Sequence, residues 1–346
     1  MVSILAIGIA ARLGDEQVLS SILRERPSVI VQYWTRGKKT TDVGVNHLVC
    51  VSSTGKASPE QNPIQSFSGL KISPDFSYIA CSRQVAAPPD EKRDYITEIP
   101  PYNTNVQIAS ATQVLFKKTF HAATSIFWIG QNLHTDPDMG TTISQMEKTA
   151  PWIESKVNVP PVARRTFAQP ESNGDYFSFQ PDRSLPIFYY HSEGRVKTCR
   201  LNSQSPSQLM SLTGTPDFLY IDGFGGGVYI LNGITGVSQK TLIRHFERSA
   251  WLPDSKILAT MPVVLVPSDA HITLYDAATK SSRRLNLRNR VVRNFIALNS
   301  RELLVSSVKN SKKVLERVNP VTGSTISVNL EKYDGSSWLQ FESCMN

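Results

Sequence analysis

The chain is poor in residues that carry local catalytic or metal-binding motifs. Its four cysteines, Cys50, Cys81, Cys199 and Cys344, are scattered without a C-x-x-C pair, and its six histidines have no partner at zinc-ligand spacing. No Gly-x-Ser-x-Gly elbow occurs, and the glycine-rich segment 223–227 lacks the Lys-Ser/Thr pair of a phosphate-binding loop. We therefore expect no bound metal, no cofactor and no hydrolase site encoded in one short segment.

The chain also lacks a long apolar run. No stretch approaches the roughly 20 apolar residues of a membrane span, and the mostly apolar segment 1–11 has no preceding Lys or Arg. We expect segment 1–11 to be a retained strand, with a cleaved signal peptide as the alternative, and residues 19–34 to supply further strands. Three cysteines fall in predicted strands, where a free cysteine behaves as a small hydrophobe. This pattern favours the cytoplasm or nucleus, and secretion only if segment 1–11 is removed.

What the sequence does contain is a repeated turn between two alternating strands. The turn reads Asn or Asp, two residues, Thr and usually Gly, and clear copies begin at Asn232, Asp276 and Asn319, which are 44 and 43 residues apart. An Asn or Asp side chain can bond its own backbone two residues on, and Gly adopts a positive φ without steric cost. Weaker copies occupy residues 47–55, 106–116, 142–153 and 195–210.

A second phrase, a Pro-Asp turn before an apolar strand, marks the start of each unit. It occurs at residues 74–75, 181–182, 216–217 and 253–254, with a degenerate copy at 299–302. Hairpins repeated with a period in the forties are typical of a β-propeller. We predict an all-β fold, a seven-bladed β-propeller of four-stranded antiparallel blades, as a single domain over residues 1–346. Long loop insertions are expected near 85–104 and 154–174.

The two phrases resemble the start and finish of blades in WD-repeat and YVTN/TolB-like propellers, over about residues 66–330. The resemblance is specific for the fold alone, since the Gly-His and Trp-Asp dipeptides of WD repeats are missing throughout. It implies a disc that presents loops and two flat faces to partners, often as a non-catalytic scaffold. The final strand, residues 337–341, should pair with N-terminal strands, because an open end would expose sheet edges.

Positive charge is concentrated in the last two repeats. Residues 280–317 contain eleven basic residues against Glu302 and Glu316, a net charge of +9 when the whole chain carries +8. Alternation in segment 284–288 should bury its leucines and expose its arginines, and Arg290 and Arg293 should also face outward. We name the following candidate partner-binding residues the basic sector: Arg283, Arg284, Arg288, Arg290, Arg293, Lys309, Lys312 and Lys313.

The leading interpretation is a non-catalytic interaction scaffold without intrinsic hydrolase activity. Its basic sector would bind an acidic protein segment, a nucleic acid or an anionic head group, because guanidinium groups suit phosphate and carboxylate and a focused positive field attracts acidic partners. One alternative is an enzyme or a small-ligand or glycan-binding propeller that uses the mouth of its central channel. Others are a structural subunit of a larger assembly, and a solvated basic edge without a dedicated ligand.

Overall fold

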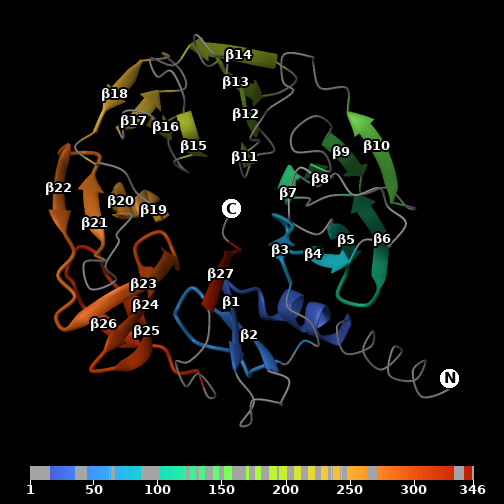
Figure 1. Ribbon diagram of the computed structural model, residues 1–346, viewed down its shortest axis with the longest axis horizontal. Coiled ribbons are helices and arrows are strands. Elements are labelled where there is room, and N and C mark those ends of the chain that lie inside the picture. The colour runs from blue at the N-terminus through green and yellow to red at the C-terminus, as the bar shows by residue number, and fades with distance from the viewer. Residues whose placement is uncertain are drawn as a thin grey trace. The chain divides into compact units, whose positions relative to one another are not determined.

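The computed structural model describes most of the repeats. The described residues are 16–35, 45–61, 63, 67–86, 102–121, 125–129, 132–136, 143–147, 152–157, 169–170, 176–180, 187–192, 195–200, 206–211, 217–222, 227–232, 235, 237–241, 243, 248–262, 271–330 and 339–344. Strands dominate them, and the exceptions are a helix at 16–25 and the 3-10 turn η2 (Pro253–Ser255) (Figure 1). The prediction of an all-β fold is confirmed.

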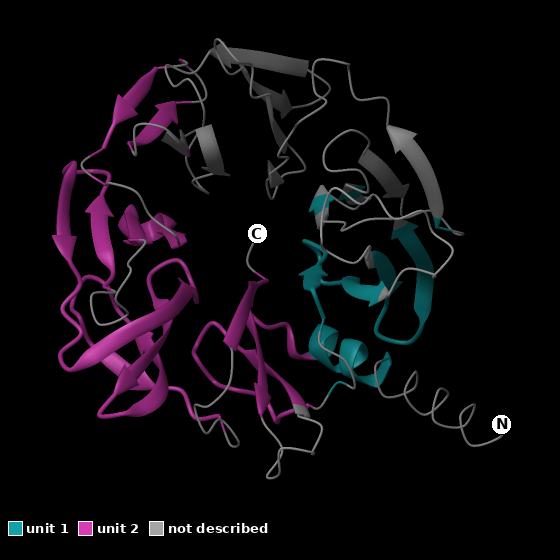
Figure 2. Ribbon diagram, viewed as in Figure 1, with its two compact units in different colours: residues 1–24, 63–181, 187–198 teal, residues 25–62, 182–186, 199–346 magenta. Residues whose placement is uncertain are grey.

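The chain divides into two compact units (Figure 2). Unit 1 comprises residues 1–24, 63–181 and 187–198, and unit 2 comprises residues 25–62, 182–186 and 199–346. The described strands form six four-stranded sheets and one three-stranded sheet. Four-stranded antiparallel sheets are thus confirmed, whereas the count of seven blades in one domain stays a prediction.

The sheets of unit 1 each follow the order of their strands in the sequence. The first contains β3 (Gly69–Ile72), β4 (Ile79–Ala86), β5 (Tyr102–Ala109) and β6 (Val114–His121). The second contains β7 (Ser125–Ile129), β8 (Asn132–Asp136), β9 (Ile143–Glu147) and β10 (Ile153–Val157). The third contains β11 (Gln169–Pro170), β12 (Tyr176–Gln180), β13 (Ile187–Ser192) and β14 (Arg195–Arg200), whose last two residues belong to unit 2.

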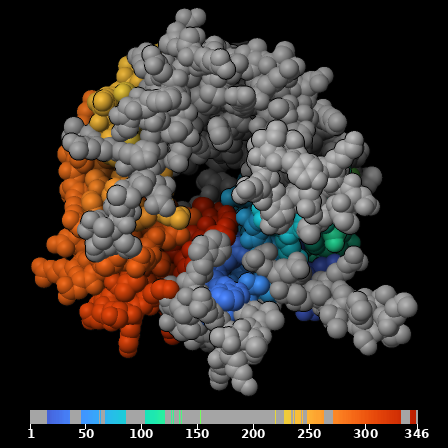
Figure 3. Space-filling model, viewed as in Figure 1, coloured from blue at the N-terminus to red at the C-terminus, as the bar shows by residue number. Residues whose placement is uncertain are grey.

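Unit 2 holds three further four-stranded sheets. They are β15 (Pro206–Ser211), β16 (Asp217–Asp222), β17 (Val228–Asn232) and β18 (Ser238–Lys240); β19 (Arg248–Leu252), β20 (Ile257–Met261), β21 (Thr273–Asp276) and β22 (Ser281–Arg284); and β23 (Arg290–Ala297), β24 (Leu303–Lys309), β25 (Lys312–Val318) and β26 (Thr325–Ser327). In the space-filling view the orange and red atoms of the last two of these sheets form a continuous surface (Figure 3).

The repeated turns have the hydrogen bonds that the sequence predicts. Asp276 Oδ1 and Asn319 Oδ1 each accept from the backbone N–H groups two and three residues on, at 2.8 to 3.1 Å. Asn232 Oδ1 accepts from the N–H three residues on at 2.8 Å. Gly323 has φ +72°, and Lys280, at the corresponding place in its turn, has φ +56°. The Asn or Asp side chain therefore defines each turn even where the glycine is replaced.

The three-stranded sheet joins the two ends of the described chain. Strand β1 (Val29–Thr35) pairs antiparallel with β2 (Val45–Val51) on one edge and with β27 (Leu339–Ser343) on the other. The predicted pairing of the last strand with N-terminal strands is confirmed. After β2 the chain turns back, and the segment 57–61 runs antiparallel to β2. Two isolated bridges, Leu48–Gln61 and Val51–Ala57, connect them.

An apolar layer holds this three-stranded sheet to its neighbour in unit 2. Val29, Val31 and Tyr33 pack with Leu304 and Leu315 of the β23–β26 sheet. Each fully buried aliphatic side chain of this kind contributes about 1.5–3 kcal/mol to stability. The packing of these side chains therefore joins the two sheets.

The predicted strand at the N-terminus is partly wrong. Residues 16–25 form a helix, whose buried residues Val18, Leu19, Ile22 and Leu23 recur at the three- and four-residue spacing of a helical face. Strand β1 confirms the second half of the predicted segment 19–34. Residues 1–15 lie outside the described part of the chain. Among the described residues, no helix has the length and apolar character needed to cross a membrane.

Strands extend into both ranges in which long loops are predicted. Strands β4 and β5 continue into both ends of the range 85–104, and strands β10 and β11 occupy parts of the range 154–174. The central residues of both ranges, 87–101 and 158–168, lie outside the described residues.

Three cysteines whose side chains the structure describes are buried and form no disulfide bond, namely Cys50, Cys81 and Cys344. Burial raises the pKa of the Cys50 thiol to about 12, so this thiol stays protonated at neutral pH. Cys50 therefore acts as a packing residue rather than a nucleophile.

Candidate active site and basic sector

A cluster of polar side chains from β1, β2 and the segment after β2 lies next to the apolar layer between the three-stranded sheet and the β23–β26 sheet. Tyr33 lies directly opposite His47 in the antiparallel register, and Thr35 follows on the same face two residues later. The Tyr33 and His47 rings stack with centroids 4.7 Å apart and an interplanar angle of 15°. His47 therefore has Tyr33 as its direct neighbour and Thr35 as its diagonal neighbour across the strands.

Hydrogen bonds connect these residues in one chain. His47 Nε2 lies 2.6 Å from Thr35 Oγ1, and His47 Nδ1 lies 2.7 Å from Glu60 Oε1. Tyr33 donates its hydroxyl to Glu60 Oε2 at 2.6 Å. An ionised carboxylate can only accept, so we assign the imidazole proton to Nδ1, which leaves Nε2 to accept from the Thr35 hydroxyl. We call this arrangement the Thr35–His47–Glu60 relay.

Burial differs along the relay. The His47 and Glu60 side chains are 3% and 4% exposed, whereas Thr35, the last residue of β1, is only half-buried. A half-buried threonine hydroxyl, an imidazole bonded to it and a carboxylate bonded to the imidazole follow the order of a serine-hydrolase triad, with threonine in place of serine. The low dielectric around His47 and Glu60 strengthens both hydrogen bonds. Chemically, the relay can withdraw a proton from the Thr35 hydroxyl.

No local sequence motif encodes this relay. Its members are 12 and 13 residues apart and meet only through the β1–β2 register and the return of segment 57–61. One signal was available in the sequence: His47 is a polar residue on the inward face of a strand that otherwise continues with Leu, Val, Cys and Val. A polar residue in that position requires a partner.

In the basic sector, Arg290 does not face outward. Its guanidinium donates to both carboxylate oxygens of Glu316, at 2.5 and 2.8 Å, and to Thr325 Oγ1 at 3.2 Å. The Arg290 and Glu316 side chains are only 10% and 5% exposed. The hydrogen bonds that Arg290 donates to Glu316 raise the pKa of Arg290 above its usual value. The prediction of an exposed Arg290 is therefore wrong, because a carboxylate on β25 pairs with it.

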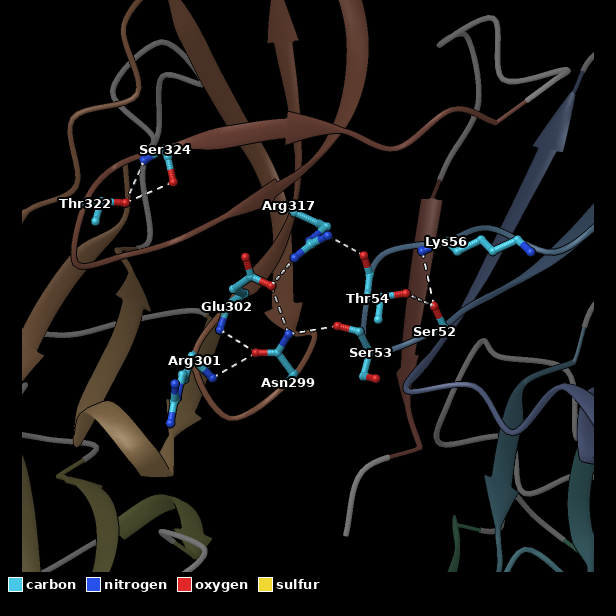
Figure 4. Close-up of polar contacts among 10 residues, drawn as sticks. All are labelled: Ser52, Ser53, Thr54, Lys56, Asn299, Arg301, Glu302, Arg317, Thr322 and Ser324. Carbon is cyan, nitrogen blue, oxygen red and sulfur yellow. Dashed lines mark hydrogen bonds and ion pairs between the residues drawn. The ribbon is translucent and has the colours of Figure 1, made fainter.

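Two other arginines of residues 280–317, Arg283 and Arg317, form hydrogen bonds with backbone carbonyls of turns distant in the sequence. Arg283 donates to the Pro320 carbonyl at 2.6 Å. Figure 4 shows Arg317 between the Thr54 carbonyl and Glu302, with which it forms an ion pair at 2.7 Å. Asn299 adds a parallel link, since it donates to the Ser53 carbonyl and to Glu302, both at 2.9 Å.

Gly55 completes this contact between turns. It has φ +79°, and a Cβ atom added there would collide with the Arg317 side chain. Both the backbone conformation and the close approach of Arg317 require glycine at this position. Arg317 thus serves structure rather than partner binding.

Other basic-sector residues do face outward. Arg284, Arg288 and Arg293 are exposed, and within the described part of the chain their side chains make no hydrogen bond or ion pair. Leu285 is buried and Leu287 packs against the same core, which confirms the predicted alternation of segment 284–288. The remaining basic-sector residues belong to the β24–β25 hairpin, namely Lys309, Lys312 and Lys313.

Comparison with known proteins shows the fold. No protein-family model matches the chain, and no curated protein matches it. Among solved structures, a putative 6-phosphogluconolactonase from Bacteroides fragilis is 14% identical, with a TM-score of 0.52 over 91% of this chain and 98% of that chain. The β-propeller domain of the Trilobed protease from Pyrococcus furiosus is 11% identical, with a TM-score of 0.56 over 88% and 95%.

A third similar structure is the acylaminoacyl peptidase of Pyrococcus horikoshii. It is 10% identical, with a TM-score of 0.53 over 88% of this chain but only 51% of that chain. These likenesses show that the chain has a β-propeller fold. They do not extend to membership of the WD-repeat or YVTN family.

The comparisons overturn the scaffold interpretation. The structures that share this fold carry the names of a lactonase and of peptidases or their propeller domains, which are hydrolytic enzymes. The expectations of a non-catalytic scaffold and of no enzymatic activity are therefore corrected. The physical reason for the error is that a site assembled from separate strands leaves no local motif, as the Thr35–His47–Glu60 relay illustrates.

Proposed function

We propose that this propeller is a hydrolase that cleaves a carboxylic ester or lactone with Thr35 as nucleophile. The observation that carries the proposal is the continuous hydrogen-bond chain from Thr35 Oγ1 through His47 to Glu60, with links of 2.6 and 2.7 Å. A threonine hydroxyl is a weak nucleophile by itself and needs an adjacent base. His47 supplies the base, and Glu60 orients it and stabilises its protonated form.

The reaction would proceed in two steps. Thr35 Oγ1 attacks the carbonyl carbon while its proton passes to His47 Nε2, and the C–O bond then breaks as the leaving oxygen takes that proton. In a lactone the leaving hydroxyl stays on the acyl group. Water next attacks the acyl-threonine and gives a proton to His47 Nε2, which returns it to Thr35 Oγ1 as the acid departs.

Support for an ester or lactone substrate comes from the extent of the structural likenesses. The match covers 98% of the lactonase chain, so the propeller there makes up almost the whole protein. It covers about half of the peptidase chain, 51%, which leaves a large further part outside the propeller. A hydrolytic site within the propeller itself, which the relay would form, therefore agrees better with a lactonase than with a peptidase. A kinship with WD-repeat or YVTN/TolB-like propellers and a single seven-bladed domain also remain proposals, supported by the repeated turns.

Turnover of chromogenic esters and of a lactone panel tests the relay. We expect Thr35→Val and His47→Gln to lower kcat/KM by at least about 10³-fold, as loss of a nucleophile or base does in other triads. Thr35→Ser should retain activity, because it keeps the hydroxyl. A fluorophosphonate probe should label residue 35 in the native protein, and this labelling should disappear in His47→Gln.

Thr273→Val is the matched control, since Thr273 is also a half-buried strand threonine of unit 2. The control should leave turnover and labelling unchanged, and circular dichroism should show the same fold in all variants. If Thr35→Val hydrolyses the panel as well as Thr273→Val does, the relay is a structural network and the proposal fails.

A further inference from the structure

A concave surface lies between the loop that joins β22 to β23 and the turn that joins β25 to β26. Its cavity has a volume of about 400 Å³, and an adjoining cavity of about 430 Å³ shares part of its wall. The polar groups that line the first cavity are Arg283, Arg284, Asn286, Arg288, Arg290, Thr322 and Thr325. We call it the arginine pocket. All of its residues belong to unit 2.

The arginines of this pocket fall into two kinds. Arg290 is neutralised by Glu316, and Arg283 is bound to the Pro320 carbonyl. The Arg284 and Arg288 side chains are exposed and make no hydrogen bond or ion pair with any described residue. The residues that line the pocket include no Asp or Glu. Two guanidinium groups therefore present their donors to solvent at one concave site.

The rest of the lining suits a small ligand with a carbon body. Val321, which is 59% exposed, and Leu287 give the pocket apolar surface beside the arginines. Asn286 is exposed and offers an amide. Gly323, in the β25–β26 turn, leaves open space, because a Cβ atom there would meet no atom within 4 Å. Charge, neutral donors and apolar surface thus meet within one cavity.

We propose that the arginine pocket binds a phosphate monoester through Arg284 and Arg288. Planar guanidinium groups form paired N–H···O bonds with phosphate oxygens, and two of them match the double negative charge of a monoester at neutral pH. A concave site favours a small molecule over a polymer, because the unpaired arginines that line the cavity are confined to the end of β22 and the loop that follows it. This inference does not depend on the relay, since binding is measured without turnover.

Titration calorimetry with phenyl phosphate and with inorganic phosphate tests the site on the full chain. We expect saturable binding with one site, and we expect Arg284→Met/Arg288→Met to weaken it by at least about tenfold, as the loss of charge-assisted hydrogen bonds requires. Arg293→Met/Lys309→Met is the matched control. It removes the same charge from exposed residues outside the cavity and should change the affinity by less than about twofold.

Three results would overturn the proposal. One is the absence of saturable binding by either phosphate. Another is equal weakening by the two double variants, which would assign the binding to a diffuse positive field. The third is binding of heparin or DNA without binding of phenyl phosphate, which would indicate a polymer surface instead.

Discussion

The Thr35–His47–Glu60 relay and the arginine pocket belong to the same compact unit and use polar groups in opposite ways. In the relay, His47 and Glu60 are almost fully buried, and both ring nitrogens of His47 have partners. In the pocket, the Arg284 and Arg288 side chains are exposed and have no partner among the described residues. The relay is already organised around Thr35, whereas the pocket offers charges that only a ligand can satisfy.

Two arginine–glutamate ion pairs explain why some arginines of residues 280–317 are buried while Arg284 and Arg288 are exposed. Glu316 pairs with Arg290, and Glu302 pairs with Arg317. These two glutamates are the only acidic residues between positions 280 and 317. The net charge of that stretch therefore does not measure the charge available to a ligand. Burial costs a charged group several kcal/mol unless it is paired, so the paired arginines can be buried and the unpaired ones stay at the surface.

The largest effect should follow from removal of β27, which forms one edge of the three-stranded sheet that carries the relay. Deletion of residues 339–346 removes the partner of Val29–Tyr33 and the packing of Leu339 and Phe341. Since each apolar side chain contributes about 1.5–3 kcal/mol when fully buried, we expect the melting temperature to fall by about 10 °C. Deletion of residues 345–346 alone is the control. An unchanged melting curve for the longer deletion would show that β1 does not need this partner.

A smaller effect should separate buried from exposed arginines. Glu316→Ala leaves the Arg290 guanidinium unpaired at 10% exposure, and we expect it to cost about 2–3 kcal/mol of unfolding free energy in urea titrations. Arg284→Ala should cost less than about 0.5 kcal/mol, as surface substitutions usually do. Equal costs for the two variants would contradict the division of the basic sector.

Much of the fold was predictable because its turns are local. The side chains of Asn232, Asp276 and Asn319 bond backbone groups two or three residues away, so spacing in the sequence is enough to find them. Alternation likewise predicted buried leucines and exposed arginines in segment 284–288. The helix at 16–25 was not predicted, because a short apolar segment is compatible with a strand as well as with a helix.

The candidate sites depend on contacts between distant residues, which local patterns do not encode. Glu60 reaches His47 only through the return of segment 57–61 along β2. Glu316 reaches Arg290 across 26 residues and from a different strand. Sequence therefore predicted which residues are charged, but not which of these charges are neutralised.

The smallest expected effect concerns Asp276. Its carboxylate is not buried as that of Glu60 is, and it has hydrogen-bond partners, which the Arg284 and Arg288 side chains lack among the described residues. The backbone N–H of Thr279 donates to its carboxylate and, with that of Ala278, holds the pKa of Asp276 below its usual value. A carboxylate with a lowered folded-state pKa stabilises the protein above the unfolded-state pKa of about 3.9, and this contribution is lost as the pH falls through the folded-state value. Asp276→Asn keeps the cap, as Asn232 and Asn319 do in the sister turns, but it cannot ionise. We therefore expect wild type and variant to differ by less than about 1 kcal/mol near pH 7. In urea titrations the advantage of wild type should shrink below about pH 4, where the lowered carboxylate becomes protonated. A difference that stays constant from neutral pH to below the folded-state pKa would show that the Asp276 charge contributes nothing to the turn.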